Sequence, residues 1–327
     1  ASGFFLRRFR AARPIRFLSE GISHSKMPLA VHPGPARSGL KRLAAVSTGS
    51  SGWGFLLFCV ALVGCADSTG VQRFAGEPPD VYDDQSWSAV LRDHVKDGLV
   101  DYDGLKADAG NLQRYGAVLS ATGPTQTPKQ FENVASRTAY WINAYNACVL
   151  LAAVKAYPTT TLYDLSMPRI EEDISFLVDG SSHRLVDIAR KALEEAQGDV
   201  RVVFALSRGA IGTPRLRDEP YRAASLDAQL TDAVARSLSN PSLLYVDDDS
   251  RSILVWQDIL SRQDDIIRYW QEQRRSRHAY LYNVLVELAS SEGSVRLQNA
   301  AGYTIREIPC NRALNSWSPR HQWPVIH

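Results

Sequence analysis

The sequence predicts a helix-rich α+β fold, a single globular domain with small antiparallel β-hairpins. Apolar residues recur at helical spacing along most of the chain after residue 83, and two stretches have a strand–turn–strand pattern. Alternating strand–helix–strand units, GxGxxG and Walker loops do not occur, so a nucleotide-binding sheet is not expected. The 327 residues are 45% hydrophobic and 22% charged, which is an ordinary globular balance.

The first helices are predicted over residues 84–98 and 102–121, where apolar side chains return every three or four positions. A longer helix is predicted from Pro128 to the residue before Pro158. Proline suits the first turn of a helix but cannot continue one, so both ends of this helix carry a physical signal.

Two hairpins and four more helices complete the predicted domain. Residues 174–186 hold two short strand-like runs about Asp179-Gly180, and residues 243–256 hold two more about a polar turn. The further helices are predicted over residues 186–197, 223–239, 257–273 and 276–291. We expect one domain over residues 81–316 and an irregular tail over 317–327.

Charge is distributed unevenly along the chain, although the formal net charge is only +2. Residues 1–64 carry nine Lys or Arg and one acidic residue, which leaves 28 of the 37 basic and 34 of the 35 acidic residues for the remainder. That remainder has a net charge of −6 and no basic cluster interleaved with aromatic residues. We therefore expect no nucleic-acid partner.

Residues 1–64 have the features of a leader or signal peptide. A basic patch around Lys41 precedes the apolar run 55–63, which is too short for the ~20 residues that span a bilayer. Leu62-Val63-Gly64-Cys65 then resembles the bacterial lipobox, in which the cysteine thiol receives a lipid. Several acyl chains on one residue make a durable anchor, so the membrane is an expected partner through Cys65.

The predicted location is the cell envelope, anchored in the membrane and facing the periplasm. Asp67, the second residue after Cys65, favours retention at the inner membrane in well-studied sorting systems. Residues 65–80 are rich in Gly, Pro, Asp and Ser, which is typical of a flexible tether.

Other interpretations of this region stay open. A short membrane or core helix can end in a cysteine by coincidence. The Arg-rich stretch 4–17 also resembles an organelle transit peptide. Translation can also start at Met27, one of two methionines, with residues 1–26 as an extension.

Cysteine use after the anchor is limited to Cys148 and Cys310. They either form a disulfide or are two buried free thiols. No CxxC or His/Cys spacing indicates zinc, and we expect no metal and no cofactor.

The stretch AYWINAYNA, residues 139–147, places Asn143 and Asn146 three positions apart in an apolar helix. Residues at that spacing share one helix face, and a buried amide without partners is destabilising. The pair is interpreted either as a structural clamp on backbone groups of a neighbouring loop or as amides that orient a substrate or stabilise an oxyanion.

WINAYNA followed by Ala156-Tyr157-Pro158 resembles the signature of the domain-of-unknown-function 547 family, N-x-Y-N-A and then Y-P. Other runs resemble that family in the same order, so that the similarity extends over about 84–316. They are LRDHVKDGLVDYDGL (91–105), DVRVVFAL (199–206), IGTPRLRDEPY (211–221), LDAQL (226–230) and ALN (313–315). The resemblance implies an exported bacterial protein whose biochemical activity is not established.

The chain departs from the family where chemistry would be expected. Members commonly carry H-F-A-L-x-C-x-S-I-G-C-P, but here the histidine position is Val203 and the cysteine positions are Arg208 and Thr213. A thiolate near a histidine would be a natural nucleophile and base. From these residue types we infer a degenerate thiol site in this chain.

The polar residues that remain in this region are the candidate site. The catalytic candidates are Asn143, Asn146, Ser207, Arg208 and Thr213, and the binding candidates are Arg217, Glu219 and Tyr221. Ser207 is a candidate nucleophile without an evident base. Arg208 and Arg217 are suited to hold a carboxylate or phosphate, unless Arg217 pairs internally with Glu219 or Asp218.

Two hypotheses follow for function. In the first, the protein is a binding or interaction module for an unknown envelope ligand or protein, and the thiol chemistry has been lost. In the second, it is an envelope hydrolase or transferase that uses the Ser207–Thr213 loop with Asn143 and Asn146 as orienting amides. Convergence of these side chains on one open cleft would favour the enzyme.

Overall fold

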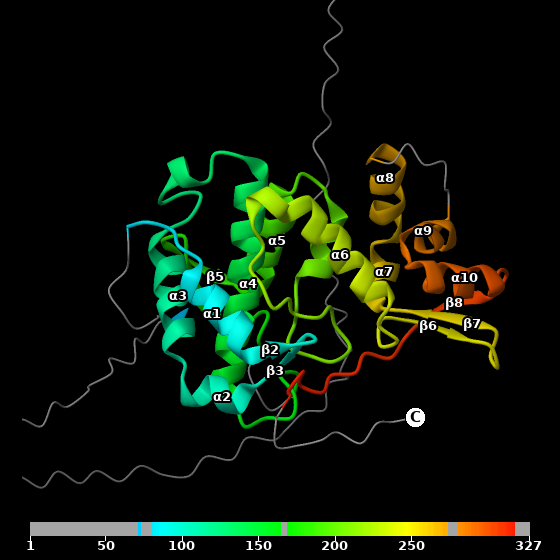
Figure 1. The fold of residues 1–327 in the computed structure, drawn as a ribbon, viewed down its shortest axis with the longest axis horizontal. Coiled ribbons are helices and arrows are strands. Elements are labelled where there is room, and N and C mark those ends of the chain that lie inside the picture. The colour runs from blue at the N-terminus through cyan, green and yellow to red at the C-terminus, as the bar shows by residue number, and fades with distance from the viewer. Residues whose placement is uncertain (1–70, 73–79, 165–168, 274–279, 318–327) are drawn as a thin grey trace, which may run out of the picture. The chain divides into compact units, whose positions relative to one another are not determined.

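The computed structural model describes residues 71–72, 80–164, 169–273 and 280–317 (Figure 1). These residues all belong to one compact unit, Gly64–His327. The predicted leader, the lipidation site Cys65 and Asp67 lie outside the described residues. Within the part of the chain that is described, no helix is both long and apolar enough to span a bilayer.

Helices dominate the fold, and the predicted helix-rich α+β class is confirmed. The α-helices are α1 (Gln85–His94), α2 (Tyr102–Ala107), α3 (Gly110–Ala121), α4 (Val134–Ala156), α5 (Leu185–Glu195), α6 (Leu226–Leu238), α7 (Gln257–Ser261), α8 (Gln263–Gln273), α9 (Leu281–Leu288) and α10 (Ser291–Asn299). The short 3₁₀ helices are η1 (Pro128–Gln130), η2 (Val200–Ala205) and η3 (Ala223–Ser225).

The strands form three small sheets with the orders β1-β4-β5, β2-β3 and β6-β7-β8. They are β1 (Val71–Gln72), β2 (Val95–Lys96), β3 (Leu99–Val100), β4 (Ser175–Val178), β5 (Ser181–Arg184), β6 (Leu244–Asp247), β7 (Ser252–Val255) and β8 (Thr304–Glu307). Both predicted hairpins, β4–β5 and β6–β7, are confirmed as antiparallel pairs. Each also gains a parallel third strand, β1 on β4 and β8 on β7, which the sequence did not predict.

The helix predicted over 84–98 is wrong at its C-terminal end. The chain leaves the helix after His94 and forms the two-stranded β2–β3 sheet about Asp97 and Gly98. Both turn residues have positive φ, 52° and 79°, which is the conformation that short hairpin turns require. A Cβ on Gly98 would lie 2.4 Å from the Cβ of Arg215, so position 98 has no room for a side chain.

Two other predicted helices are each divided in two. Residues 102–121 contain α2 and α3, and residues 257–273 contain α7 and α8. Residues 274–279 are not described, so the start of the helix predicted over 276–291 is untested; α9 and α10 occupy residues up to Asn299.

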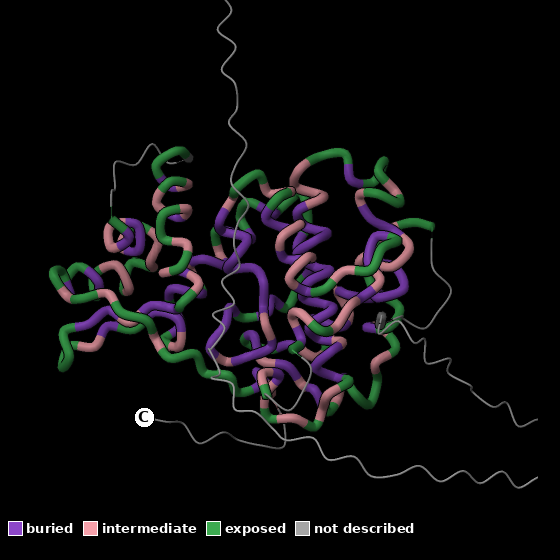
Figure 2. Tube along the Cα trace, turned by 180° about the vertical axis from the view of Figure 1, so that it is seen from behind, coloured by how far each residue is buried: buried purple, intermediate pink, exposed green. Residues whose placement is uncertain are grey.

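Helix α4 is the centre of the fold. Its N-terminus is capped by Asn133, whose side chain accepts a hydrogen bond from the backbone N–H of Ser136 at 2.8 Å, and it ends at Ala156, two residues before Pro158. Buried residues occur on all of its faces, as expected for a helix surrounded by protein. Figure 2 shows buried segments gathered in the interior helices, with the exposed ones on the outer turns. The side chains from Thr138 to Leu150 are therefore all enclosed by the rest of the domain.

Residues 244–307, here called the C-terminal module, comprise β6–β8 and α7–α10 (Figure 1). This module packs on α6 through α9 and on η2 through α8. The rings of Phe204 in η2 and Trp256 lie 6.5 Å apart, edge to face.

Residues 311–317, here called the closing segment, return to the core beyond that module. The backbone N–H of Asn315 donates to the carbonyl of Gly209 at 3.1 Å, and that of Ile211 donates to Ala313 at 2.9 Å. Val100 in β3 exchanges hydrogen bonds with Asn315 and Trp317, at 2.8 and 2.7 Å. The closing segment thus lies between the first hairpin and the loop after η2.

Candidate functional site

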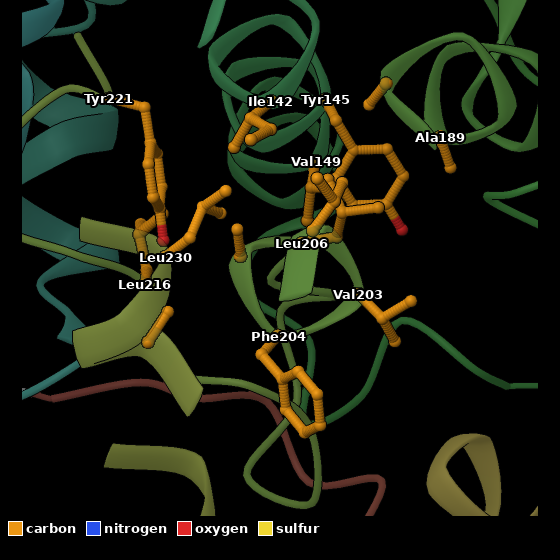
Figure 3. Packing of buried hydrophobic residues seen from close by; sticks show 14 of the residues in the cluster. Ile142, Tyr145, Val149, Ala189, Val203, Phe204, Leu206, Leu216, Tyr221 and Leu230 are labelled. Carbon is orange, nitrogen blue, oxygen red and sulfur yellow. The ribbon is translucent and has the colours of Figure 1, made fainter. Parts of the chain in front are cut away.

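Asn146 of α4 holds the chain that leaves η2. Its amide is 2% exposed, its Nδ2 donates to the carbonyl of Ala205 at 3.0 Å, and its Oδ1 accepts from the backbone N–H of Ser207 at 2.9 Å. These two hydrogen bonds fix the backbone on both sides of Leu206. Figure 3 shows Leu206 beside Val149 of α4, while Val203 and Phe204 point away from it.

Asn143 forms the same kind of hydrogen bonds to the backbone of a different segment. Its Nδ2 donates to the carbonyl of Tyr221 at 2.8 Å, and its Oδ1 accepts from the N–H of Tyr221 at 2.9 Å and from the Trp87 indole at 3.3 Å. The prediction that both amides bond to backbone groups is confirmed. The expectation that both amides hold one neighbouring loop is wrong, because three residues of helix rise about 4.5 Å and the two amides reach different segments.

The loop 207–213 is bonded internally and largely buried, with Arg208 and Ile211 partly exposed. Ser207 and Thr213 are each 3% exposed. The Thr213 hydroxyl donates to the carbonyl of Ala210 at 2.8 Å and accepts from the N–H of Arg208 at 3.4 Å. Gly212 permits the backbone of Asn311 to approach closely, since a Cβ at position 212 would lie 2.5 Å from the backbone nitrogen of Asn311.

Arg208 is paired with carboxylates from two distant segments. Its guanidinium forms an ion pair with Asp258 of α7, lies 3.6 Å from a Glu171 oxygen, and stacks over the Trp256 ring at 5.6 Å from the centroid. Burial opposes the charged form, but Asp258 and then Glu171 outweigh it and raise the pKa of Arg208 above its usual value. The guanidinium joins the candidate loop to the C-terminal module.

Arg217 is also paired internally, which agrees with the alternative in which it pairs with Glu219. Its Nη2 donates to Glu219 at 2.6 Å and its Nη1 to Asp232 of α6, while the guanidinium stacks over the Tyr221 ring at 5.8 Å. Arg217 therefore contacts both of the other predicted binding residues, and it also pairs with Asp232.

We expect a Glu219→Gln variant to resist acid better than the wild type. The hydrogen bond from Arg217, then that from Gln229, lowers the pKa of Glu219. Its folded pKa is below its unfolded pKa, so its stabilising effect is present above that unfolded value and is lost as the pH falls through the folded one.

Urea unfolding from about pH 6 to pH 3 measures the effect. The wild type should lose more free energy of unfolding than Glu219→Gln over this range, with the exposed Asp218→Asn as the control. Identical losses in the wild type and Glu219→Gln would contradict the assignment.

The sequence analysis missed two further amide clamps. Gln229 donates to the carbonyl of Pro220 at 2.9 Å and accepts from the N–H of Arg222 at 2.9 Å. Asn315 of the closing segment accepts from the Tyr102 hydroxyl at 2.8 Å. A polar residue on the apolar face of a predicted helix signalled Gln229, whereas nothing local signalled Asn315.

Cys148 and Cys310 are both free, so the disulfide interpretation is wrong. The alternative, two buried free thiols, is correct for Cys148 but wrong for Cys310, which is exposed. Burial raises the pKa of Cys148 far above its usual value and also raises that of Cys310. Neither environment promotes a reactive thiolate.

The candidate catalytic residues do not converge on an open cleft. Asn143, Ser207 and Thr213 are 1–3% exposed, and apolar side chains such as Leu206 occupy the space beside α4 (Figure 3). Among the described residues, no group of three His, Cys, Asp or Glu side chains is arranged to hold a metal ion.

Residues 129–237 match the family model described as protein of unknown function, DUF547. The predicted resemblance is confirmed over that segment, which includes both α4 amides, the candidate loop and Arg217. No curated protein matches the chain, and no solved structure does. The DUF547 segment ends before the C-terminal module, so the Arg208–Asp258 ion pair joins it to residues beyond the match.

Proposed function

We propose that this protein is a binding module of the bacterial cell envelope, held at the membrane by a lipid on Cys65. The lipobox-like Leu62-Val63-Gly64-Cys65 after a basic patch and a short apolar run supports the anchor. Asp67 supports the inner membrane, with the domain in the periplasm.

The observation that carries the binding role is that the polar groups of the candidate loop already have partners inside the protein. The amides of Asn143 and Asn146 hold backbone, and the Thr213 hydroxyl holds its own loop. Arg208 is neutralised by carboxylates. A catalytic group must reach a substrate with a free lone pair or proton, and these groups serve the fold instead.

The loss of a thiol site also supports a binding role. The positions of the family's two cysteines hold Arg208 and Thr213, and the histidine position holds Val203. Thr213 bonds to the N–H of Arg208, so these two positions are neighbours in space. The replacements stabilise the loop with an ion pair and hydroxyl bonds in place of nucleophile chemistry.

The alternative, an envelope hydrolase or transferase using the Ser207–Thr213 loop, receives less support. Ser207 is 3% exposed, and its backbone N–H is bonded to Asn146. A serine nucleophile needs a base within hydrogen-bond reach and room for a substrate carbonyl.

The full-length chain in detergent provides the test. We expect a fluorophosphonate probe to leave Ser207 unmodified in peptide mapping, native mass spectrometry to reveal a retained ligand, and labelled fatty acid to enter the wild type but not Cys65→Ser. A Ser207 adduct that disappears in Ser207→Ala would overturn the binding role, and equal labelling of Cys65→Ser would overturn the anchor.

A further inference from the structure

A pocket of about 510 Å³ lies within the DUF547 segment, at the N-terminal ends of α4 and α6. None of the predicted site residues lines it. The volume falls within the range of small-molecule sites. Its wall is largely apolar and is built from short side chains, with Val134, Ala135, Ala224, Leu226 and Leu230 among them.

Thr138 lines this pocket and carries a polar group without a partner. Its side chain is 1% exposed, and its hydroxyl has no hydrogen bond in the described structure. A threonine in a helix often bonds to a carbonyl one turn earlier, and two χ1 rotamers are accessible to it. A hydrogen bond from this hydroxyl to a ligand would therefore replace no bond that exists in the free protein.

The charged groups of the pocket favour a cation. Arg201 donates through Nε and Nη2 to Asp199, at 2.7–3.1 Å, through Nη2 to Asp227 at 2.8 Å, and through Nη1 to Thr231 at 2.8 Å. One guanidinium therefore faces two carboxylates, and its donors are occupied. The Asp227 side chain remains 89% exposed.

An anion in this pocket would be repelled by two carboxylates and would face a guanidinium whose hydrogen-bond donors are already bonded. Asn133 already caps the N-terminus of α4, whereas the N-terminus of α6 has no side-chain cap and is the part of the wall that suits an anion. An ammonium group, in contrast, can share the exposed carboxylate of Asp227 while its carbon chain contacts the apolar wall.

We propose that this pocket binds a small organic amine, with the ammonium at Asp227 and Asp199, the alkyl body against the apolar wall, and the Thr138 hydroxyl as a further hydrogen-bonding group. The inference rests on the proposed binding function and names the ligand class. It places the ligand site away from the loop 207–213.

The test uses the full-length chain in detergent near neutral pH, with 3-methylbutylamine as the probe. The matched neutral and anionic probes are 3-methylbutanol and 4-methylpentanoate. Saturation-transfer NMR titration should show binding of the amine alone. Asp227→Asn should weaken it by about two- to fivefold, because the Asp227 side chain is 89% exposed and an exposed ion pair contributes at most about 1 kcal/mol.

Two further variants make the test specific. Asp218→Asn removes an exposed carboxylate outside the pocket and should leave amine affinity unchanged. Thr138→Val should weaken amine binding several-fold without lowering the melting temperature, since the hydroxyl has no partner to lose in the free protein.

The inference is overturned if the alcohol or the carboxylate binds as well as the amine, or if Asp227→Asn binds with wild-type affinity. If no amine binds while native mass spectrometry still shows a retained ligand, the ligand class is wrong and the binding function stands. A Ser207 adduct overturns the binding function whatever the amine does.

Discussion

Asn143→Ala is expected to lower the free energy of unfolding by about 3 kcal/mol. The substitution leaves the N–H and carbonyl of Tyr221 and the indole N–H of Trp87 without their partner, all in a region closed to water. An unsatisfied buried group is destabilising by about 1–3 kcal/mol, and the three groups share one amide. Denaturant unfolding followed by tryptophan fluorescence measures the loss.

The control is Asn299→Ala at the exposed end of α10. It removes an amide of the same size and should change the free energy of unfolding by no more than about 0.5 kcal/mol. A loss for Asn143→Ala as small as that of the control would show that Asn143 is not a clamp.

Arg208→Met is expected to cost about 3 kcal/mol, near the lower end for breaking a buried ion pair, since the Arg208 side chain is still 27% exposed. The loss comes from Asp258, whose side chain is 16% exposed and loses the guanidinium with which it pairs. Adding Asp258→Leu to Arg208→Met should recover part of the loss, because an apolar pair of similar size replaces the buried carboxylate.

Arg92→Met is the matched control, because Arg92 pairs with Asp93 at the surface with side chains 70% and 47% exposed. Surface ion pairs contribute about 0–1 kcal/mol, so this variant should unfold almost as the wild type does. If Arg208→Met and Arg92→Met are equally stable, Arg208 does not hold the C-terminal module in place.

Local signals in the sequence predicted much of the fold. The C-terminal end of helix α4 follows from Pro158, its interior from its apolar composition, and β4–β5 from the Asp179-Gly180 turn. The predicted start of α4 at Pro128 is wrong, because Pro128 opens η1 and α4 begins at Val134 after the Asn133 cap. Asp97-Gly98 carries the same turn signal, but strands of two residues are too short to show alternation. Strand β8 pairs with a strand about fifty residues earlier, and no short-range pattern encodes that pairing.

The candidate site was predicted less completely for the same reason. The spacing of Asn143 and Asn146 showed that both amides face one side of a buried helix, but it could not show which segments they reach. Asp258 was missed as the partner of Arg208 because fifty residues separate them and an acidic residue early in a helix already has a local explanation.

The closing segment bears on how the protein comes to be made. The carbonyl of Gly209 and the N–H of Ile211 find their partners only in residues more than one hundred positions further along the chain. During synthesis, the loop that follows η2 therefore stays incomplete until residues 313–315 have left the ribosome. Contacts so distant in sequence form slowly, so completion of this loop should be among the last events of maturation.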